Sequence, residues 1–466
     1  MLAISGGCRV LVLVGEQVES LFDEALPIEV RELPEDLAGL DELLSDPVLL
    51  APITAAWEAA ARERGRPSIA MSLFVRLMVL KQRTGWGYET LVREVSDSLH
   101  LRRFCGLSLT ASVPHESTVR KLVGRLGPDV VDEITRVLIT KAQREKRFVA
   151  RAMRCDSTVV EADVRWPSDA ALALDAARRL ARDGARVAAK VAKEARRVQD
   201  RSRAVGRRLR LIGRTVGRRL GKTGGARTKV LELTGQTGDL VRRSIREARA
   251  LAAQARRSAR GRGAQAKLRA AERLEQTADL AEKACRQITQ RLAGERITDR
   301  LVSLADPDAR PIGKGKLGKN YEFGYVFQLA ELTPNTRRGA RGLILPAAST
   351  VGSPNESELL PATVAELDRL GLKPKEVAVD GGFPVDAVNQ AFPDANVFVA
   401  GRQHPPSRRS KKRLASYRAG AEGRISHLKR GYGMRRSRLR GHDGARTWTG
   451  WGILTYNLDT LTVQTP

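Results

Sequence analysis

The sequence predicts an α/β core that carries an all-α domain at its N-terminal side and a long helical-hairpin insert. Three observations lead to this fold class. Short apolar runs typical of strands occur with helical segments in 143–168 and 301–466. Residues 66–142 instead have apolar side chains at helical spacing. Residues 169–300 are rich in Ala, Arg and Leu, which favours long helices.

The N-terminal part divides into an extension, 1–65, and a compact helical domain, 66–142. Within this domain we expect helices at 69–80, 88–99 and 117–126. The last of them carries Arg120 and Lys121, so it resembles the helix of a helix-turn-helix that enters the major groove of DNA. A helical cap or a dimerisation bundle is the alternative, because exposed basic residues are common on helices.

The insert at 169–300 is strongly basic. Residues 171–300 hold 35 Lys and Arg and 13 Asp and Glu, which gives a net charge of +22 out of +29 for the whole chain. We expect two long antiparallel helices, 170–220 and 240–292, separated by glycines. A coiled coil that serves only as a scaffold would mix acids with bases on its outer faces. The imbalance therefore favours DNA contact, with a scaffold or dimerisation coiled coil as the alternative.

The α/β core is expected to return after the insert. We predict strands at 148–160, 321–332, 342–346, 377–380 and 396–400. A helix at 362–370 precedes the fourth strand, and the apolar segment 448–461 forms a final helix that packs on the sheet. The insert would then separate the first strand from the second.

One helix of the core is predicted to carry a charged stripe. Arg418, Glu422 and Lys429 fall within about 40° of one another at 100° per residue. Apolar residues flank this stripe at helical spacing: Leu414, Ala421, Ile425, Leu428 and Tyr432. The buried flank would hold the charged face against the body of the protein, as expected for a functional site.

Two aspartates are placed to meet this stripe. Asp156 lies within the first predicted strand, and Asp380 ends the fourth, directly before two glycines. In an α/β sheet a carboxylate at such a strand end faces the crevice where ligands bind. Each aspartate taken alone would more often be a turn former or a helix cap.

Three motifs together carry a resemblance to a known family: Asp156 in a first strand, Asp380 at a Val-Asp-Gly-Gly strand end, and Arg418, Glu422 and Lys429 in the order Arg-x3-Glu-x6-Lys. The chain resembles the DDE transposases encoded by bacterial insertion sequences. In that family the third motif usually begins with a tyrosine, whereas Ala415 stands at this position here. The similarity covers about 150–466 apart from the insert, and a weaker similarity extends over the first 140 residues.

The resemblance implies an RNase H-like core, with a mixed five-stranded sheet flanked by helices. It implies that Asp156, Asp380 and Glu422 hold two divalent cations, Mg²⁺ with Mn²⁺ as a substitute, and act in catalysis. Arg418 and Lys429 would contact DNA phosphates. The implied activity is cleavage of the transposon ends by water and joining of the freed 3′-hydroxyls to target DNA, by a homodimer.

Two other functions stay open. The chain could be a catalytically inactive DNA-binding protein derived from a transposase, in which the charge is retained and the acids have no role. It could also be an RNase H-like nuclease that cuts DNA without joining it. Substitution of Asp380 by Ala distinguishes an active transposase, which should lose strand transfer, from the inactive DNA-binding protein. A strand-transfer assay identifies a nuclease that cuts DNA without joining it.

A second basic cluster follows the charged stripe: Arg435, Arg436, Arg438 and Arg440. Close to an active site, such a cluster is expected to clamp the phosphate backbone of double-stranded DNA. Taken alone, it would be interpreted as an arm that binds nucleic acid without sequence preference.

Composition agrees with a DNA partner. The net charge is +29 with a pI near 10.8, which is typical of proteins that bind a polyanion. Uninterrupted apolar stretches of about eighteen residues, as a membrane span needs, are absent from the sequence. The apolar start is interrupted by glycines and Arg9, unlike a secretory signal. We expect a cytoplasmic protein associated with the bacterial nucleoid.

The cysteines and histidines do not indicate a metal site. Cys8, Cys105, Cys155 and Cys285 are scattered without Cys-x2-Cys spacing, so we expect reduced thiols. The five histidines show no paired spacing typical of zinc ligands. Metal chemistry therefore has to come from carboxylates.

Overall fold

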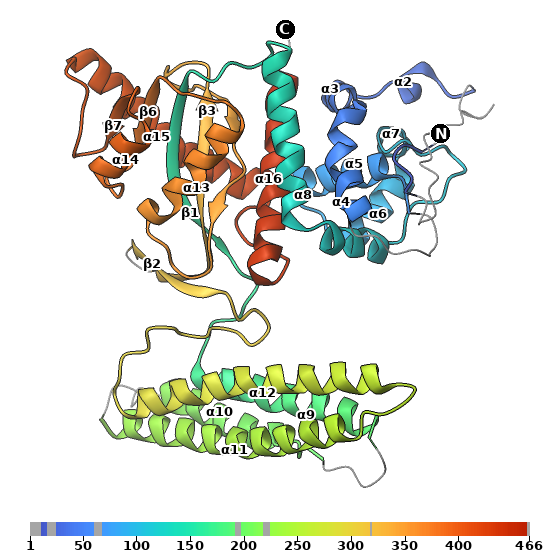
Figure 1. Ribbon diagram of the computed structural model, residues 1–466, viewed down its shortest axis with the longest axis vertical. Coiled ribbons are helices and arrows are strands. Elements are labelled where there is room, and N and C mark those ends of the chain that lie inside the picture. Colours follow the sequence, from blue (N-terminus) through green and yellow to red (C-terminus); the bar gives the residue numbers. More distant parts are fainter. Residues whose placement is uncertain are drawn as a thin grey trace. The chain divides into compact units, whose positions relative to one another are not determined.

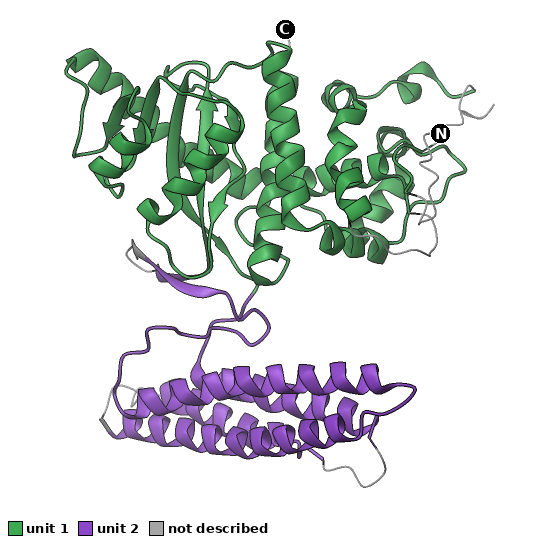
Figure 2. Ribbon diagram, in the orientation of Figure 1, with its two compact units in different colours: residues 1–163, 324–466 green, residues 164–323 purple. Residues whose placement is uncertain are grey.

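The computed structural model describes residues 11–15, 25–59, 68–191, 197–217, 224–316 and 319–463. Cys8, residues 1–10 of the apolar start and most of the first predicted glycine break lie outside these residues. The chain forms two compact units, residues 1–163 with 324–466 (unit 1) and residues 164–323 (unit 2), shown in Figure 2. No helix of the described part is long and apolar enough to cross a membrane.

The N-terminal part of unit 1 is helical (Figure 1). Its elements are α2 (Ile28–Arg31), α3 (Glu35–Leu44), the 3-10 helix η1 (Pro47–Leu50), α4 (Ala51–Ala59), α5 (Met71–Thr84), α6 (Tyr88–Asp97), α7 (Leu99–Phe104) and α8 (Glu116–Arg144). The helices predicted at 69–80, 88–99 and 117–126 are thus confirmed. Helix α8 is kinked at Gly127, directly after the last predicted helix, and a second helical segment then continues to Arg144. Helix α5 is buried on nearly all sides, and its buried residues include Arg76, Lys81 and Gln82 as well as apolar side chains.

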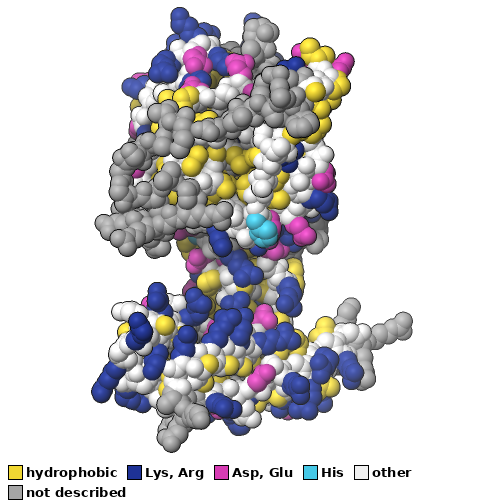
Figure 3. Space-filling view, turned by 90° about the vertical axis from the view of Figure 1, so that its right-hand side faces the viewer, with side chains coloured by type: hydrophobic (Ala, Val, Ile, Leu, Met, Phe, Trp, Pro, Cys, Tyr) yellow, Lys and Arg dark blue, Asp and Glu magenta, His cyan; other side chains and the backbone are white. Residues whose placement is uncertain are grey.

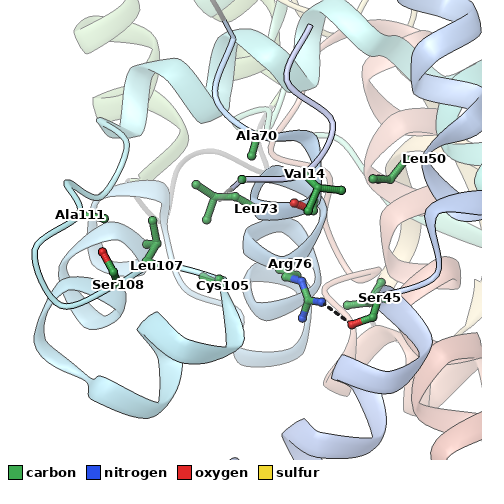
Figure 4. Close-up of a pocket in the computed structure, with 14 residues that line it drawn as sticks. Val14, Ser45, Leu50, Ala70, Leu73, Arg76, Cys105, Leu107, Ser108 and Ala111 are labelled. Carbon is green, nitrogen blue, oxygen red and sulfur yellow. Dashed lines mark hydrogen bonds between the residues drawn. The ribbon is translucent and has the colours of Figure 1, made fainter. Parts of the chain in front are cut away.

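One buried arginine ties three of these helices together. Arg76 of α5 donates to the carbonyl of Phe104 in α7 at 2.9 Å and to Oγ of Ser45, just after α3, at 3.1 Å. Its guanidinium also pairs with Asp41. Figure 4 shows Arg76 directed toward Ser45 at the edge of a cavity of about 470 Å³. Because the charge is satisfied on three sides, Arg76 stabilises this packing.

A mixed sheet follows the helices. The described strands are β1 (Ala152–Glu161), β2 (Arg310–Lys316), β3 (Lys319–Thr333), β4 (Leu343–Ile344), β5 (Ala348–Ser349), β6 (Glu376–Val379) and β7 (Asn396–Val399). The order is β2-β3-β1-β6-β7, with β4 and β5 also paired to β3. Strands β1 and β3 are antiparallel, whereas β1, β6 and β7 are parallel.

Each predicted strand of the core is present. The described sheet has seven strands where the sequence predicts five. The difference arises because β2 precedes β3 and because the two-residue β5, too short for a periodic signal, also pairs with β3.

Alternation along the strands gives the sheet two different buried faces. Met153 and Cys155 of β1, with Val377 and Val379 of β6, pack in one large core that continues into the N-terminal helices. Ala152 and the other intervening residues pack instead under a C-terminal helix, in a small cluster: Ala152, Ala378, Phe398, Leu414 and Tyr417. By this alternation, Asp156, which follows Cys155, and Asp380, which follows Val379, face the C-terminal helix that carries Leu414 and Tyr417.

Four helices complete unit 1: α13 (Glu356–Arg369), α14 (Val385–Ala391), α15 (Arg408–Gly431) and α16 (Gly441–Val463). Helix α15 packs on β1, β6 and β7 and carries the predicted charged stripe. Helix α16 packs against α8, α5 and β4, and Asn457 exchanges two hydrogen bonds of 2.8 Å with the backbone of Ile344. A mixed sheet flanked by helices is therefore confirmed, and the helices 66–142 form part of the same unit.

Unit 2 contains strand β2 and a bundle of four described helices: α9 (Asp169–Ala188), α10 (Ser202–Gly217), α11 (Gly224–Arg257) and α12 (Ala264–Leu292). Its core is lined largely by alanines, among them Ala176, Ala252 and Ala278, together with a few Leu, Val and Ile. Small side chains let helix axes approach closely, so the alanine-rich composition produces a tightly packed bundle rather than a single extended arm.

The sequence predicts two long helices here, and the structure has four. The first predicted helix is divided into α9 and α10. The side chain of Asp200 accepts a hydrogen bond of 2.8 Å from the backbone of Ser202 and so marks the start of α10. The glycines near 235–238, expected to break the chain, lie inside α11. A Cβ at Gly235 would lie 3.2 Å from Leu292 of α12, and a Cβ at Gly238 would lie 3.3 Å from Ile288. These glycines therefore allow the close packing of α11 on α12.

Candidate active site

The two predicted aspartates lie side by side. Strands β1 and β6 are parallel, and their last registered pair is Cys155 with Val379. Asp156 and Asp380 are the next residue on each strand, where neighbouring strands lie about 4.8 Å apart. Both side chains face α15 by the alternation of the strands. Two residues more than 200 positions apart are thus brought together by strand register.

A glutamate that the sequence analysis did not single out completes an acidic group. Glu356 is the first residue of α13, and its carboxylate lies with those of Asp156 and Asp380 so that one oxygen from each is within 4.8 Å of the others. Gln328 of β3 holds the start of α13, because its side-chain amide donates to the carbonyl of Glu356 at 2.8 Å. The sheet therefore positions all three acids.

Two glycines after Asp380 make room for this arrangement. A Cβ at Gly382 would lie 2.2 Å from Oε2 of Glu356, and a Cβ at Gly381 would lie 2.7 Å from the carbonyl oxygen of Ala400. Any larger residue at these positions would force the chain or the carboxylate to move. The Asp-Gly-Gly sequence is therefore required by close approach.

Arg418 connects the acidic group to Glu422. Its Nη2 lies 3.3 Å from Oδ2 of Asp380 and 3.9 Å from Oδ2 of Asp156, and its Nη1 lies 3.2 Å from Oε1 of Glu422. Glu422 is one turn further along α15, and 68 % of its side chain is exposed. Glu422 is thus next to the group, although the described residues within metal-ligating range of one another are Asp156, Glu356 and Asp380.

A buried ion-pair network fixes α15 on the sheet. Arg154 of β1 pairs with Glu331 of β3 at 2.6 Å, and Arg424 of α15 contacts the same carboxylate at 2.9 Å. Arg154 also donates to the carbonyl of Tyr417 at 3.0 Å. Arg154 can reach α15 because residue 420 is a glycine. A Cβ at this position would lie 2.1 Å from Nη1 of Arg154. This network sets the position of Arg418 and Glu422.

The electrostatics of the group favour binding of a cation. Burial, and then the neighbouring Asp380 and Asp156, raise the pKa of Glu356 to about 7. Burial also raises the pKa of Asp156, against the opposing effects of a hydrogen bond from Ser157 and of Arg418. Oε2 of Glu356 is buried and lacks a hydrogen-bond partner among the described residues. Close carboxylate oxygens, one of them unsatisfied, are the donor set that suits Mg²⁺ or Mn²⁺.

The remaining basic residues predicted for the site lie elsewhere on unit 1. Lys429 is half-buried on α15, two turns beyond Glu422. The cluster after α15 is Arg435, Arg436, Arg438 and Arg440, all exposed. Within it, Arg436 pairs with Glu161 at 3.0 Å, at the end of the strand that carries Asp156. Arg120 and Lys121 are exposed on α8, where Arg120 pairs with Glu116.

Two parts of the chain match family models. Residues 31–125 match a family described as a transposase domain, and residues 339–458 match a family described as a transposase DDE domain. The second match includes Glu356, Asp380 and Glu422, whereas Asp156 and the whole of unit 2 lie outside both. A search of curated proteins and a search of solved structures each gave no match.

Proposed function

Because the chain belongs to the DDE transposases of the insertion-sequence type, we propose that it cleaves the ends of its mobile element and joins the freed 3′-hydroxyls to target DNA. The observation that supports this most directly is the register of β1 and β6. It ends at Cys155 and Val379, so the next residues, Asp156 and Asp380, lie side by side near Glu356. The mixed sheet flanked by helices fits the RNase H-like core of such enzymes. Two ends have to be handled together, so we propose a homodimer.

The carboxylates have the role of metal ligands in this proposal. Asp156, Asp380 and Glu356 would hold divalent ions, with Glu422 joining them from α15 once Arg418 moves to a DNA phosphate. Bound Mg²⁺ ions activate the attacking oxygen and stabilise the leaving oxygen in phosphodiester cleavage. Without bound ions, the guanidinium of Arg418 offsets the negative charge of three of these acids, Asp156, Asp380 and Glu422.

Strand transfer in vitro tests this function. Purified protein is incubated with labelled duplexes that carry the ends of the element and with a supercoiled target plasmid. With Mg²⁺ or Mn²⁺ we expect 3′-nicked ends and end–target joints, and with a chelator we expect neither. Nicks without joints would identify a nuclease, and DNA binding without either product would identify a binding protein.

A pH dependence of metal binding follows from Glu356. A carboxyl group whose pKa is raised to about 7 favours the neutral form in the folded protein, so its contribution to stability is present at low pH and is lost as the pH rises through 7. A cation binds the carboxylate form. We therefore expect Mn²⁺ to bind more tightly at pH 8 than at pH 6, by at most about tenfold, the change in ionised fraction across this pKa.

Thermal unfolding with and without Mn²⁺ measures this effect. The Mn²⁺-induced rise in Tm should be larger at pH 8, and Glu356→Gln should remove most of the difference. Glu358→Gln is the matched control, since Glu358 lies on the same helix outside the acidic group. An equal Mn²⁺ response of the wild type and Glu356→Gln at both pH values would exclude Glu356 as a ligand.

For unit 2 we propose contact with the DNA backbone along α11 and α12. A groove of about 530 Å³ between these helices is lined by five arginines and two acids. Arg243, Arg246 and Arg286 lie there, and none of them forms an ion pair within 4.0 Å among the described residues, although the charge of Arg246 helps to lower the pKa of Glu247. Lys and Arg side chains also predominate on the face of unit 2 seen in Figure 3. Unpaired arginines in a groove are suited to hold phosphates.

The salt dependence of DNA binding tests this groove. Each phosphate that the protein no longer neutralises should reduce the slope of log K against log salt by about 0.9. We therefore expect Arg243, Arg246 and Arg286, all changed to Gln, to reduce it by about 2 to 3. The control is the same change of charge on α10, at Arg207, Arg210 and Arg214, which lie outside the groove. Equal reductions in the two triple variants would mean that only net charge matters.

A further inference from the structure

A second cavity in unit 1 combines basic and aromatic side chains. It has a volume of about 680 Å³ and lies where the turn between α5 and α6 meets the loop after α15 and helix α16. Four of the residues that line it are cationic, three are aromatic, and none of them is acidic. The volume is within the range of about 300–1,000 Å³ typical of sites for small ligands.

Lys81 at the end of α5 is the most unusual residue of this cavity. It is only 4 % exposed, and its Nζ lies 4.4 Å from the ring centroid of Trp448 and 4.8 Å from that of Tyr88. Among the described residues its ammonium has no hydrogen bond or ion pair. Burial, and then Arg438, lower the pKa of Lys81 to about 8. A buried ammonium is costly unless an anion accompanies it.

The rest of the cavity is held rigidly around this ammonium. The indole Nε1 of Trp448 donates to the carbonyl of Gly433 at 2.8 Å, which fixes the ring that contacts Lys81. Arg436 and Arg438 are anchored by Asp163, at 3.8 and 3.3 Å. Arg435 is exposed in the same lining and has no carboxylate partner in the described part of the chain. Two cationic groups, on Lys81 and Arg435, are thus available to an incoming anion.

We propose that this cavity binds a phosphate group of the DNA backbone between Lys81 and Arg435. A phosphate supplies the negative charge that Lys81 lacks, and arginine and lysine are the usual ligands for it. The choice of DNA as the source of the phosphate rests on the proposed function. Inorganic phosphate shares the same chemistry and is distinguished by experiment.

This site would connect the two regions that match family models. Lys81 comes from the first region, and Arg435 and Trp448 come from the second. The loop that carries Arg435 follows helix α15, which holds Glu422. A phosphate bound here would fix the DNA on both regions at once and so set its register relative to the carboxylates.

Lys81→Met in the full chain tests the proposal by DNA binding alone. The DNA is a duplex of about 30 base pairs, which is roughly 100 Å long at 3.4 Å per step. We measure the affinity of the protein for this duplex by fluorescence anisotropy at several salt concentrations. A chelator is present, so the measurement does not depend on cleavage. We expect the slope of log K against log salt to become less steep by about 0.9, with affinity about eightfold weaker at about 0.1 M salt. Arg435→Gln, on the exposed rim, should give a similar change in slope. It replaces Lys81→Met in the test if Lys81→Met does not fold.

Three comparisons complete the test. Lys81→Arg should restore the wild-type slope, and Lys373→Met, at a lysine outside the cavity, should leave it unchanged. Wild-type slopes in both Lys81→Met and Arg435→Gln would overturn the proposal. Inorganic phosphate is titrated at constant ionic strength and followed by tryptophan fluorescence. A response abolished in Lys81→Met without any change in DNA slope would assign the cavity to free phosphate and overturn the DNA assignment.

The failure of this proposal can be told apart from failure of the proposed function. If strand transfer is absent but the slope changes as expected, the cavity binds DNA in a protein that is not an active transposase. If strand transfer occurs and the slope does not change, the enzymatic function stands and the cavity has another role.

Discussion

Asp380→Ala should abolish DNA cleavage and strand transfer while DNA binding persists. Asp380 sits at the end of β6 beside Asp156 and is one of the three acids that lie within ligating range of one another. Loss of even an outer partner of a metal ligand typically costs about 10–100-fold in activity, so removal of a ligand itself should cost at least about 100-fold. Binding depends on basic surfaces elsewhere and should change little.

The measurement is a strand-transfer assay with an anisotropy titration on the same duplex. Asp386→Asn is the matched control, because Asp386 lies on α14, a few residues further along and outside the acidic group. It should leave both activity and binding intact. Unchanged joining by Asp380→Ala would refute the catalytic assignment, and loss of binding together with activity would point to a folding defect instead.

Glu331→Ala should destabilise unit 1 strongly. Glu331 is 3 % exposed and is shared by Arg154, at 2.6 Å, and Arg424, at 2.9 Å. It also accepts a hydrogen bond of 3.1 Å from the backbone of Gly342. Its removal leaves the buried guanidinium of Arg154 without a counter-charge, which typically costs about 3–5 kcal/mol.

Urea unfolding followed by tryptophan fluorescence measures this loss, because four of the five tryptophans lie in unit 1. The control is Glu94→Ala, which breaks the exposed pair of Arg93 and Glu94, with side chains 64 % and 38 % exposed. Such an exposed pair is screened by water and contributes little to stability, so the control should unfold almost as the wild type does. A loss for Glu331→Ala no greater than that for the control would show that the network does not hold α15 on the sheet.

Much of the fold and part of the candidate site could be predicted from the sequence. The strand-like runs that contain Asp156 and precede Asp380 identified the two aspartates that lie side by side, because burial on both faces of a strand leaves a clear apolar signal. The flank of the charged stripe was largely readable: Leu414, Ala421, Leu428 and Tyr432 are buried as expected, and Ile425 is partly buried. These features depend on local periodicity.

Glu356 could not be predicted, because nothing local marks it. An acid in the first turn of a helix is ordinary, since it complements the helix dipole. Its place in the acidic group depends on the missing Cβ of Gly382 and on the hold of Gln328, which are contacts between distant segments. The insert was misjudged for a similar reason: Gly235 and Gly238 look like breaks, and only the neighbouring α12 shows why they are glycines.

Unit 2 is inserted between strands β1 and β3, and its two connections to unit 1 lie next to each other. Glu161 of β1 and Gly324 of β3 are directly paired across adjacent antiparallel strands. Such partners lie about 5 Å apart, which a two-residue hairpin spans. The bundle is therefore a cassette whose entry and exit coincide. Excising it and closing the gap with Asn-Gly should leave the carboxylate scaffold assembled, and another domain could be grafted at the same junction.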